Sequence, residues 1–403
     1  MTAPRFVFHA CLGAGGFGEV YLATETTEGG LERVVAVKVL HEPLDEASDA
    51  VKRLRDEGQV LALLAHPAVL GVHELAQVDG HLALVTEYVE GVDLAWFCVP
   101  ERLLPPRVAV LVAGEVAAAL EFALSTPNPE TGRPLGLIHR DLKPENVRIA
   151  KTGQVKVLDF GVARSTEMHR RARTAAGQVI LTPGYGAPET LQFGVLGPAV
   201  DVFALGVTLF AMLTGQTFYA NDDLGRQVLL ASDSVAYREH AEARLAQIAD
   251  PDLHALVRDM VEFAHEHRPT MREIADRCDR LAHRLPGPTL LQWVRTATFP
   301  EPGASHGRYD GAHVSSTGAI TRPTPSLPLS QAPTVIREDP EPPPPPRRPE
   351  PPSEPPPPAR PAHPPPPAPT PQPWFVAATV ALVAGVLLLL VTAVAVAVWG
   401  LAG

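Results

Sequence analysis

Residues 138–146 read IHRDLKPEN, and DFG follows at residues 159–161 after a short hairpin-like interval. The two stretches bring an arginine, a lysine, an asparagine and two aspartates into one short region of the chain. This cluster of charged and amide groups is the most specific signal in the sequence. The motifs that precede and follow it gain their meaning from it.

Two weaker motifs lie upstream. Residues 12–20 read LGAGGFGEV, a G-x-G-x-x-G pattern that lets the backbone approach phosphate oxygens but also occurs in ordinary turns. Residues 34–38 read VVAVK, and their β-branched alternation predicts a strand that ends on a lysine placed to meet phosphates. Residues 49–64 have a helical pattern in which Glu57 can reach back to Lys38 as an ion pair.

The order of these motifs resembles the protein kinases, and among them the bacterial eukaryotic-like (Hanks-type) serine/threonine kinases, over roughly residues 6–285. The resemblance implies an α+β, bilobal fold, with a small β-rich N-lobe at residues 1–88 and a large helical C-lobe at residues 89–286. It also implies ATP and Mg²⁺, with Mn²⁺ as a substitute, and transfer of the γ-phosphoryl group to Ser/Thr hydroxyls of proteins, including autophosphorylation.

Carried over residue by residue, the resemblance implies four catalytic side chains. Asp141 would accept or orient the substrate hydroxyl proton. Lys143 would sit near the γ-phosphate, and this lysine is typical of serine/threonine-directed members of the family. Lys38, braced by Glu57, would hold the α and β phosphates.

The resemblance also implies the residues that bind the nucleotide and its metal. Asn146 and Asp159 would hold magnesium. Residues 84–89 look like the strand and hinge that pair with adenine, with Thr86 at the gatekeeper position. The implied ATP-binding set is Leu12, Gly13, Gly15, Gly18, Val20, Ala36, Lys38, Thr86, Glu87 and Val89.

The segment after DFG has the features of a regulated, substrate-binding region. Arg140 implies control by phosphorylation of this segment, because an arginine can pair with a phosphate. The candidate phosphosites are Ser165, Thr166 and Thr174. Thr182 is expected to contact Asp141 and Lys143 as part of the protein-substrate site. Glu189 is expected to form an ion pair with Arg268.

Two features depart from the family pattern. Arg148 stands where many members place an apolar residue at the floor of the adenine pocket. We expect its aliphatic stem to pack there while its charged head reaches solvent, which would alter ATP affinity at most. Residues 125–136 contain several prolines and glycines and predict an inserted surface loop.

Composition sets the cellular context. The net charge of −11 and the scattered basic residues give no electrostatic footprint for nucleic acid, so we expect no nucleic-acid partner. The cysteines Cys11, Cys98 and Cys278 lack the paired spacing of a zinc site or a disulfide framework and suit reducing cytosol. Cys11, beside the glycine-rich loop, is either an oxidisable thiol or, more commonly for such residues, a buried one.

Residues 287–373 become increasingly rich in proline and predict a disordered juxtamembrane linker. Polyproline runs form neither helix nor sheet, so this segment should be a stiff, solvated spacer. Its PxxP pattern also fits the groove of an SH3-like partner, although composition alone favours a plain linker.

Residues 374–399 are uncharged and almost wholly apolar, and they predict a single transmembrane helix followed by a short extracytoplasmic tail at residues 400–403. Arginines lie on the N-terminal side only, so we expect the kinase region in the cytoplasm and the chain in the inner membrane. A buried core helix is the alternative. The small residues Ala377, Ala381 and Gly385 recur at helical spacing, a pattern that would let two such helices pack closely as a homodimer.

Two other classes of protein were weighed. A catalytically inactive pseudokinase scaffold, acting through its proline-rich tail, would not need Lys38, Glu57, Asp141, Asn146 and Asp159 together. A metabolic small-molecule kinase would share the aspartates but usually lacks the LKPEN and APE features. The sequence therefore predicts a membrane-anchored serine/threonine protein kinase of bacterial type.

Overall fold

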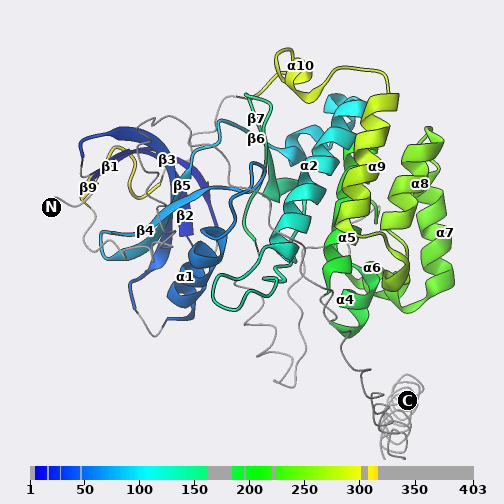
Figure 1. The fold of residues 1–403 in the computed structure, drawn as a ribbon, viewed down its shortest axis with the longest axis horizontal. Helices are drawn as coiled ribbons and strands as arrows, with labels where there is room; N and C mark the ends of the chain where they lie inside the picture. The colour runs from blue at the N-terminus through cyan, green and yellow to red at the C-terminus, as the bar shows by residue number, and fades with distance from the viewer. Residues whose placement is uncertain are drawn as a thin grey trace, which may run out of the picture. The chain divides into compact units, whose positions relative to one another are not determined.

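An antiparallel sheet of six strands, in the order β4-β5-β3-β2-β1-β9, makes up the small lobe (Figure 1). Its strands are β1 (Arg5–Ala14), β2 (Gly18–Thr26), β3 (Glu32–Pro43), β4 (Val72–Val78), β5 (His81–Glu87) and β9 (His313–Ser315). In the middle of β3, Val35, Val37 and Val39 are buried and alternate with less buried residues, as the period of a strand predicts. Helix α1 (Asp49–Leu61) begins at Ser48, whose side chain accepts a hydrogen bond from the Ala50 N–H.

The two faces of this sheet carry separate cores. Leu82 and Leu84 of β5 pack with Val51 and Leu54 of α1 on one face. The alternate residues Ala83 and Val85 belong to a second core on the opposite face, together with a cluster of aromatic rings. Because strand side chains alternate between faces, the face that carries α1 and the aromatic face are supported by different parts of the chain.

The large lobe is mainly helical. Its helices are α2 (Pro106–Ser125), α4 (Pro188–Phe193), α5 (Pro198–Thr214), α6 (Leu224–Ser232), α7 (Ser234–Leu245), α8 (Pro251–Met260), α9 (Met271–Arg284) and α10 (Leu290–Val294). Short 3₁₀ helices cover Leu94–Phe97, Pro100–Arg102, Pro144–Asn146 and His265–His267. A three-stranded sheet of β6 (Gly91–Asp93), β7 (Val147–Ala150) and β8 (Val155–Val157) lies beside the catalytic loop. The predicted bilobal kinase architecture is thus confirmed.

Helix α2 is the one helix in the described part of the chain that is long and apolar enough to cross a bilayer. It lies in the core of the large lobe, where it contacts α5 and α9, and most of its apolar residues are buried. Its hydrophobicity is therefore explained by packing within the lobe.

The computed structural model describes residues 5–15, 18–27, 29–45, 48–160, 184–194, 197–219, 224–300 and 307–315. All of them belong to the first of two units, residues 1–326. The predicted transmembrane helix at 374–399, the tail at 400–403 and most of the predicted linker lie outside these ranges.

The predicted boundary of the linker at residue 287 was wrong. Helix α10 follows, with a capping box in which the Thr289 side chain accepts from the Gln292 N–H and the Gln292 side chain accepts from the Thr289 N–H. Further along, β9 pairs with β1. Folded structure therefore extends into the proline-rich region, because isolated aromatic residues there find partners in both lobes. The predicted loop at residues 125–136 is confirmed as a mostly exposed connection after α2.

Candidate active site

A buried carboxylate holds the backbone of the catalytic loop. Asp201, near the start of α5, accepts hydrogen bonds from the N–H groups of His139 (2.6 Å) and Arg140 (2.8 Å). Arg140 has a φ of +65°, a conformation that costs energy in a non-glycine residue. Burial raises the pKa of Asp201, while His139 and the two backbone N–H groups oppose the rise. The carboxylate thus stabilises a strained turn immediately before Asp141.

The catalytic loop brings three predicted residues together. The Lys143 Nζ lies 3.4 Å from Asp141 Oδ2. The side-chain amide of Asn146 donates to the Asp141 carbonyl (2.7 Å) and lies 3.3 Å from its Oδ2. Because this amide nitrogen faces Asp141, the Asn146 Oδ1 is the oxygen that remains for a metal ion.

Lys38 and Asp159 meet across the cleft between the lobes. The Lys38 Nζ, on β3, donates to Asp159 Oδ1 over 3.2 Å. Asp159 has a φ of +47°. The side chain of Glu57, the predicted partner of Lys38, lies outside the described residues, although its backbone belongs to α1. The ion pair of Lys38 with Glu57 therefore stays a prediction, beside the described pair with Asp159.

The oxygen atoms in this region fit Mg²⁺. Asp159 supplies a carboxylate and Asn146 an amide oxygen, which are hard donors of the kind that magnesium prefers. These two side chains would hold the ion, as the sequence predicts.

A cavity of about 520 Å³ opens between the lobes, within the size range of small-molecule sites. Its walls include most of the predicted ATP-binding residues: Leu12, Gly13, Val20, Ala36, Lys38, Thr86, Glu87 and Val89. Gly15 and Gly18 are not part of these walls. They close the turn of the glycine-rich loop, where the Gly15 N–H donates to the Gly18 carbonyl (2.9 Å).

A lysine that the sequence analysis missed supports the hinge from behind. The Lys156 Nζ lies 2.6 Å from Glu87 Oε1, and the same oxygen accepts from the Gly71 N–H (2.7 Å). The Lys156 side chain is nearly buried. The sequence does carry a signal for this contact, because Lys156 lies between two valines of a short strand. A charged side chain that is buried in such a strand requires a partner.

The prediction that the charged head of Arg148 reaches solvent was wrong. Its guanidinium donates to the carbonyls of Val89 (2.9 Å) and Gly91 (2.6 Å) and to the carboxylate of Asp93 (2.5 Å). The head is therefore bound to the end of the hinge and the segment that follows it instead of extending into solvent. Both Arg148 and Asp93 line the cavity.

The described residues that begin at 184 approach the catalytic loop. Tyr185 and Gly186 line a small hollow together with Arg140 and Asp141. Burial lowers the pKa of Arg140, against the opposing charge of Asp201. The predicted phosphosites and the predicted substrate-contacting threonine lie outside the described residues: Ser165, Thr166, Thr174 and Thr182.

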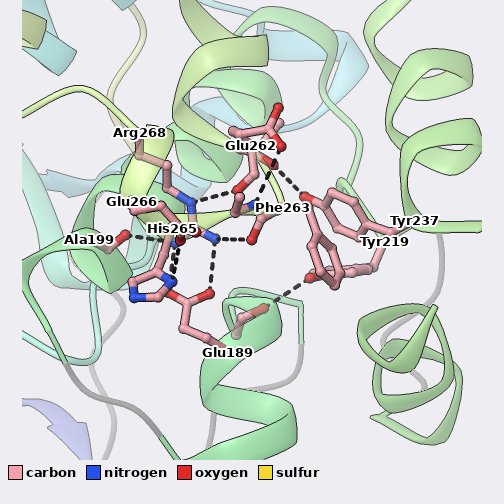
Figure 2. A network of polar contacts seen from close by, with 12 residues as sticks. Glu189, Ala199, Tyr219, Tyr237, Glu262, Phe263, His265, Glu266 and Arg268 are labelled. Atoms are coloured by element: carbon pink, nitrogen blue, oxygen red, sulfur yellow. Dashed lines mark hydrogen bonds and ion pairs between the residues drawn. The ribbon is translucent and has the colours of Figure 1, made fainter. Parts of the chain in front are cut away.

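The predicted ion pair between Glu189 and Arg268 is confirmed, and Figure 2 shows its surroundings. Two guanidinium nitrogens of Arg268 bind the two carboxylate oxygens of Glu189 at 2.7 and 2.9 Å. Arg268 also donates to the carbonyls of Ala199, Glu262 and Phe263. This fully buried arginine fixes α4, and with it the segment that leads from the active site.

The fold and these motifs together define a protein kinase. The chain belongs to the protein kinase family, because the family model described as "Protein kinase domain" matches residues 6–277.

Three curated relatives illustrate the range of similar proteins. The chain is 29% identical over 350 residues to "Serine/threonine-protein kinases drp72" of Corynebacterium efficiens, covering 84% of this chain and 61% of the relative. It is 35% identical over 231 residues to "Serine/threonine-protein kinase PknB" of Mycobacterium tuberculosis, covering 55% and 35%. It is 34% identical over 275 residues to "Tyrosine-protein kinase MasK" of Myxococcus xanthus, covering 66% and 41%. The chain thus spans less than two thirds of each relative's length.

Proposed function

We propose that this chain is a serine/threonine protein kinase that transfers the γ-phosphoryl group of ATP to protein hydroxyls and phosphorylates itself. The observation that carries the proposal is the cluster of Asp141, Lys143 and Asn146 beside a cavity whose lining includes Lys38 and Asp159. Phosphoryl transfer depends on positioning and electrostatics, and these side chains supply both.

Each side chain has a defined task in this reaction. Lys38 would bind phosphate oxygens, and Asn146 and Asp159 would hold Mg²⁺, or Mn²⁺ in its place. The ion, when bound, neutralises charge on the phosphates. Asp141 would accept the proton of the substrate hydroxyl, and Lys143, 3.4 Å away, would balance negative charge beside it.

The choice of serine/threonine over tyrosine rests on Lys143 and on the relatives named as serine/threonine kinases. One relative is named a tyrosine kinase, so the phosphorylated amino acid must be measured. The full-length chain, incubated with Mg²⁺ and γ-labelled ATP, should label serine and threonine. Label on tyrosine alone would refute this specificity.

Asp141→Asn and Lys38→Met chains are the matched controls, and both should lose the label. If the unaltered chain binds ATP but labels neither itself nor generic protein substrates, a pseudokinase scaffold becomes the better description.

We further propose that residues 374–399 anchor the chain in the cytoplasmic membrane, with the kinase region on the cytoplasmic side. Their uncharged, apolar sequence supports this. Removing residues 374–403 should move the protein from the membrane fraction to the soluble fraction. Homodimerisation through this helix depends on the membrane anchoring, and crosslinking tests it. We also propose an SH3-like partner of the proline-rich segment, and binding of a 341–373 peptide tests that proposal.

A further inference from the structure

Residues 307–315, here called the clasp, return from the end of the large lobe to the outer edge of the small-lobe sheet (Figure 1, yellow β9 beside blue β1). The backbone of β9 pairs antiparallel with β1, with Arg5 opposite Ser315 and Val7 opposite His313. The pairing continues in hydrogen bonds from the Phe8 N–H to Ala312 O (2.9 Å) and from the Gly311 N–H to Phe8 O (3.0 Å). The clasp therefore covers what would otherwise be an open sheet edge.

Tyr309 inserts the clasp into the aromatic core of the sheet. Tyr309 is 6% exposed, and the centroid of its ring lies 5.4 Å from that of Phe8 and 5.6 Å from that of Tyr21. The rings of Phe8 and Tyr21 are themselves edge to face at 5.2 Å. A buried cluster of three aromatic rings is a specific docking site, because such rings interact best in a few relative orientations.

Gly307 allows the backbone to approach this cluster closely. A Cβ atom at this position would lie 2.5 Å from the Tyr21 ring and 2.7 Å from the Cβ of Cys11. Next to it, the Arg308 N–H reaches Glu19 (3.4 Å), and the Tyr309 N–H donates to the Tyr21 hydroxyl (3.3 Å). The clasp thus touches β2 directly beside the glycine-rich loop.

The nucleotide cavity lies on the other side of the same two strands. Cys11 and Tyr21 belong to the aromatic core, whereas their neighbours Leu12 and Val20 line the cavity. Because adjacent residues of a strand point to opposite faces, Tyr309 lies directly behind the residues that cover the nucleotide site.

The segment that leads to the clasp is also tied to the cavity. Phe299 packs against Phe97 and Trp293 of the large lobe, at ring distances of 6.0 and 6.5 Å. Pro300, the next residue, lines the cavity. The chain thus lines the nucleotide cavity at Pro300. Within the clasp, Tyr309 packs on the opposite face of the strands that cover this cavity.

We propose that the clasp, through Tyr309, is a positioning element for nucleotide binding, an inference that rests on the proposed kinase function. The glycine-rich loop joins β1 to β2, so its position depends on these two strands. A clasp that immobilises these strands before ATP arrives lowers the entropic cost of binding. Asp141 and its neighbours, by contrast, are held from the large lobe by Asp201.

Because the clasp acts on the small lobe while Asp201 holds the catalytic loop, KM and kcat should respond differently to loss of the clasp. Loss of the clasp weakens nucleotide binding and raises the KM for ATP, while kcat changes little. The coupling is reciprocal, so a bound nucleotide must stabilise the docked clasp to the same extent. Linker residues beyond 315 would then act on the nucleotide site through the clasp.

The test uses the full-length chain in detergent and the variants Tyr309→Ala, Gly307→Val and Tyr309→Phe. Calorimetry with MgADP gives the Kd, and phosphorylation assays give KM and kcat. Alkylation of Cys11, located by mass spectrometry, reports clasp release because Gly307 covers that side chain. Tyr309→Ala and Gly307→Val should raise Kd and KM about tenfold, with kcat within about twofold, and should speed Cys11 alkylation.

Tyr309→Phe keeps the ring and should match the unaltered chain in all measurements, and MgADP should slow Cys11 alkylation. An unchanged Kd in variants whose Cys11 has become reactive would overturn the proposal. So would a loss of kcat at constant KM, which would indicate a smaller folded fraction. If the unaltered chain binds nucleotide but transfers no phosphate, the kinase proposal fails, while the comparison of Kd values still decides the role of the clasp.

Discussion

Arg148 and Asp93 face each other across the β6–β7 ladder, and the guanidinium Nη1 lies 2.5 Å from the carboxylate. The same guanidinium binds the carbonyls of Val89 and Gly91. One cation from the large lobe therefore holds three acceptors of the segment after the hinge. The floor of the nucleotide cavity is polar here, at a position where the family commonly has an apolar residue.

Replacing Arg148 with leucine should weaken ATP binding. The change leaves a carboxylate without its counter-charge beside an anionic nucleotide and frees the segment after the hinge, so we expect the Kd for MgATP to rise about three- to tenfold. Because the Arg148–Asp93 pair is partly exposed, its coupling energy in a cycle with Asp93→Asn should be only about 0.5–1 kcal/mol. A Kd unchanged in Arg148→Leu would show that the guanidinium has no part in nucleotide binding.

The Glu189–Arg268 pair should contribute strongly to stability. The Arg268 side chain is fully buried, so Glu189→Ala leaves a charge without its partner and should lower the free energy of unfolding by about 3–5 kcal/mol. Arg272 and Glu121 form a matched but exposed arginine–glutamate pair, and Glu121→Ala should cost less than about 1 kcal/mol. Denaturant unfolding measures both, and equal losses would contradict the role of burial.

Asp201→Asn should impair catalysis more than nucleotide binding. An asparagine offers one carbonyl oxygen and one NH₂ group, so it can accept from only one of the His139 and Arg140 N–H groups. The positive φ of Arg140 then loses support, and Asp141 moves with it. We expect kcat to fall about 10²-fold with the Kd for MgADP within about twofold. A variant with full kcat would show that the turn is held by other contacts.

Cys98 and Cys278 should resist alkylation at neutral and mildly alkaline pH. Burial raises the pKa of each thiol to about 12 from its ordinary value of 9.0. The thiolate fraction at pH 8 is therefore about 10³-fold smaller than in the unfolded chain, and iodoacetamide should label both residues correspondingly slowly.

The same rise in the thiol pKa values sets the sign of the pH dependence of stability. Between pH 9 and 12 the unfolded thiols ionise and the folded ones do not, so stability should fall as the pH rises through this window, by about 1.4 kcal/mol per pH unit and per thiol. Cys278→Ala should flatten this decline. Labelling of the native chain at the rate of a free cysteine would contradict the burial of these thiols.

Much of the site could be predicted because its residues are local motifs. Asp141, Lys143 and Asn146 lie within one short loop, so their proximity follows from chain geometry, and the strand that carries Lys38 follows from β-branched alternation. The direction of the Arg148 head could not be predicted, because its acceptors are carbonyls more than fifty residues away. Lys156 was missed for the same reason, since its partner Glu87 belongs to another strand.

The sequence by itself determined the family, the two-lobed architecture and the order of the residues around the nucleotide cavity, since each is encoded by residue type and short spacing. Only the tertiary structure decided that residues 307–315 join the small-lobe sheet. Tyr309 lies in a region whose composition predicts a linker, and nothing next to it in the sequence can bury its ring. Its partners are Phe8 and Tyr21, about three hundred residues upstream, and such a contact exists only when the sheet has already brought those rings together.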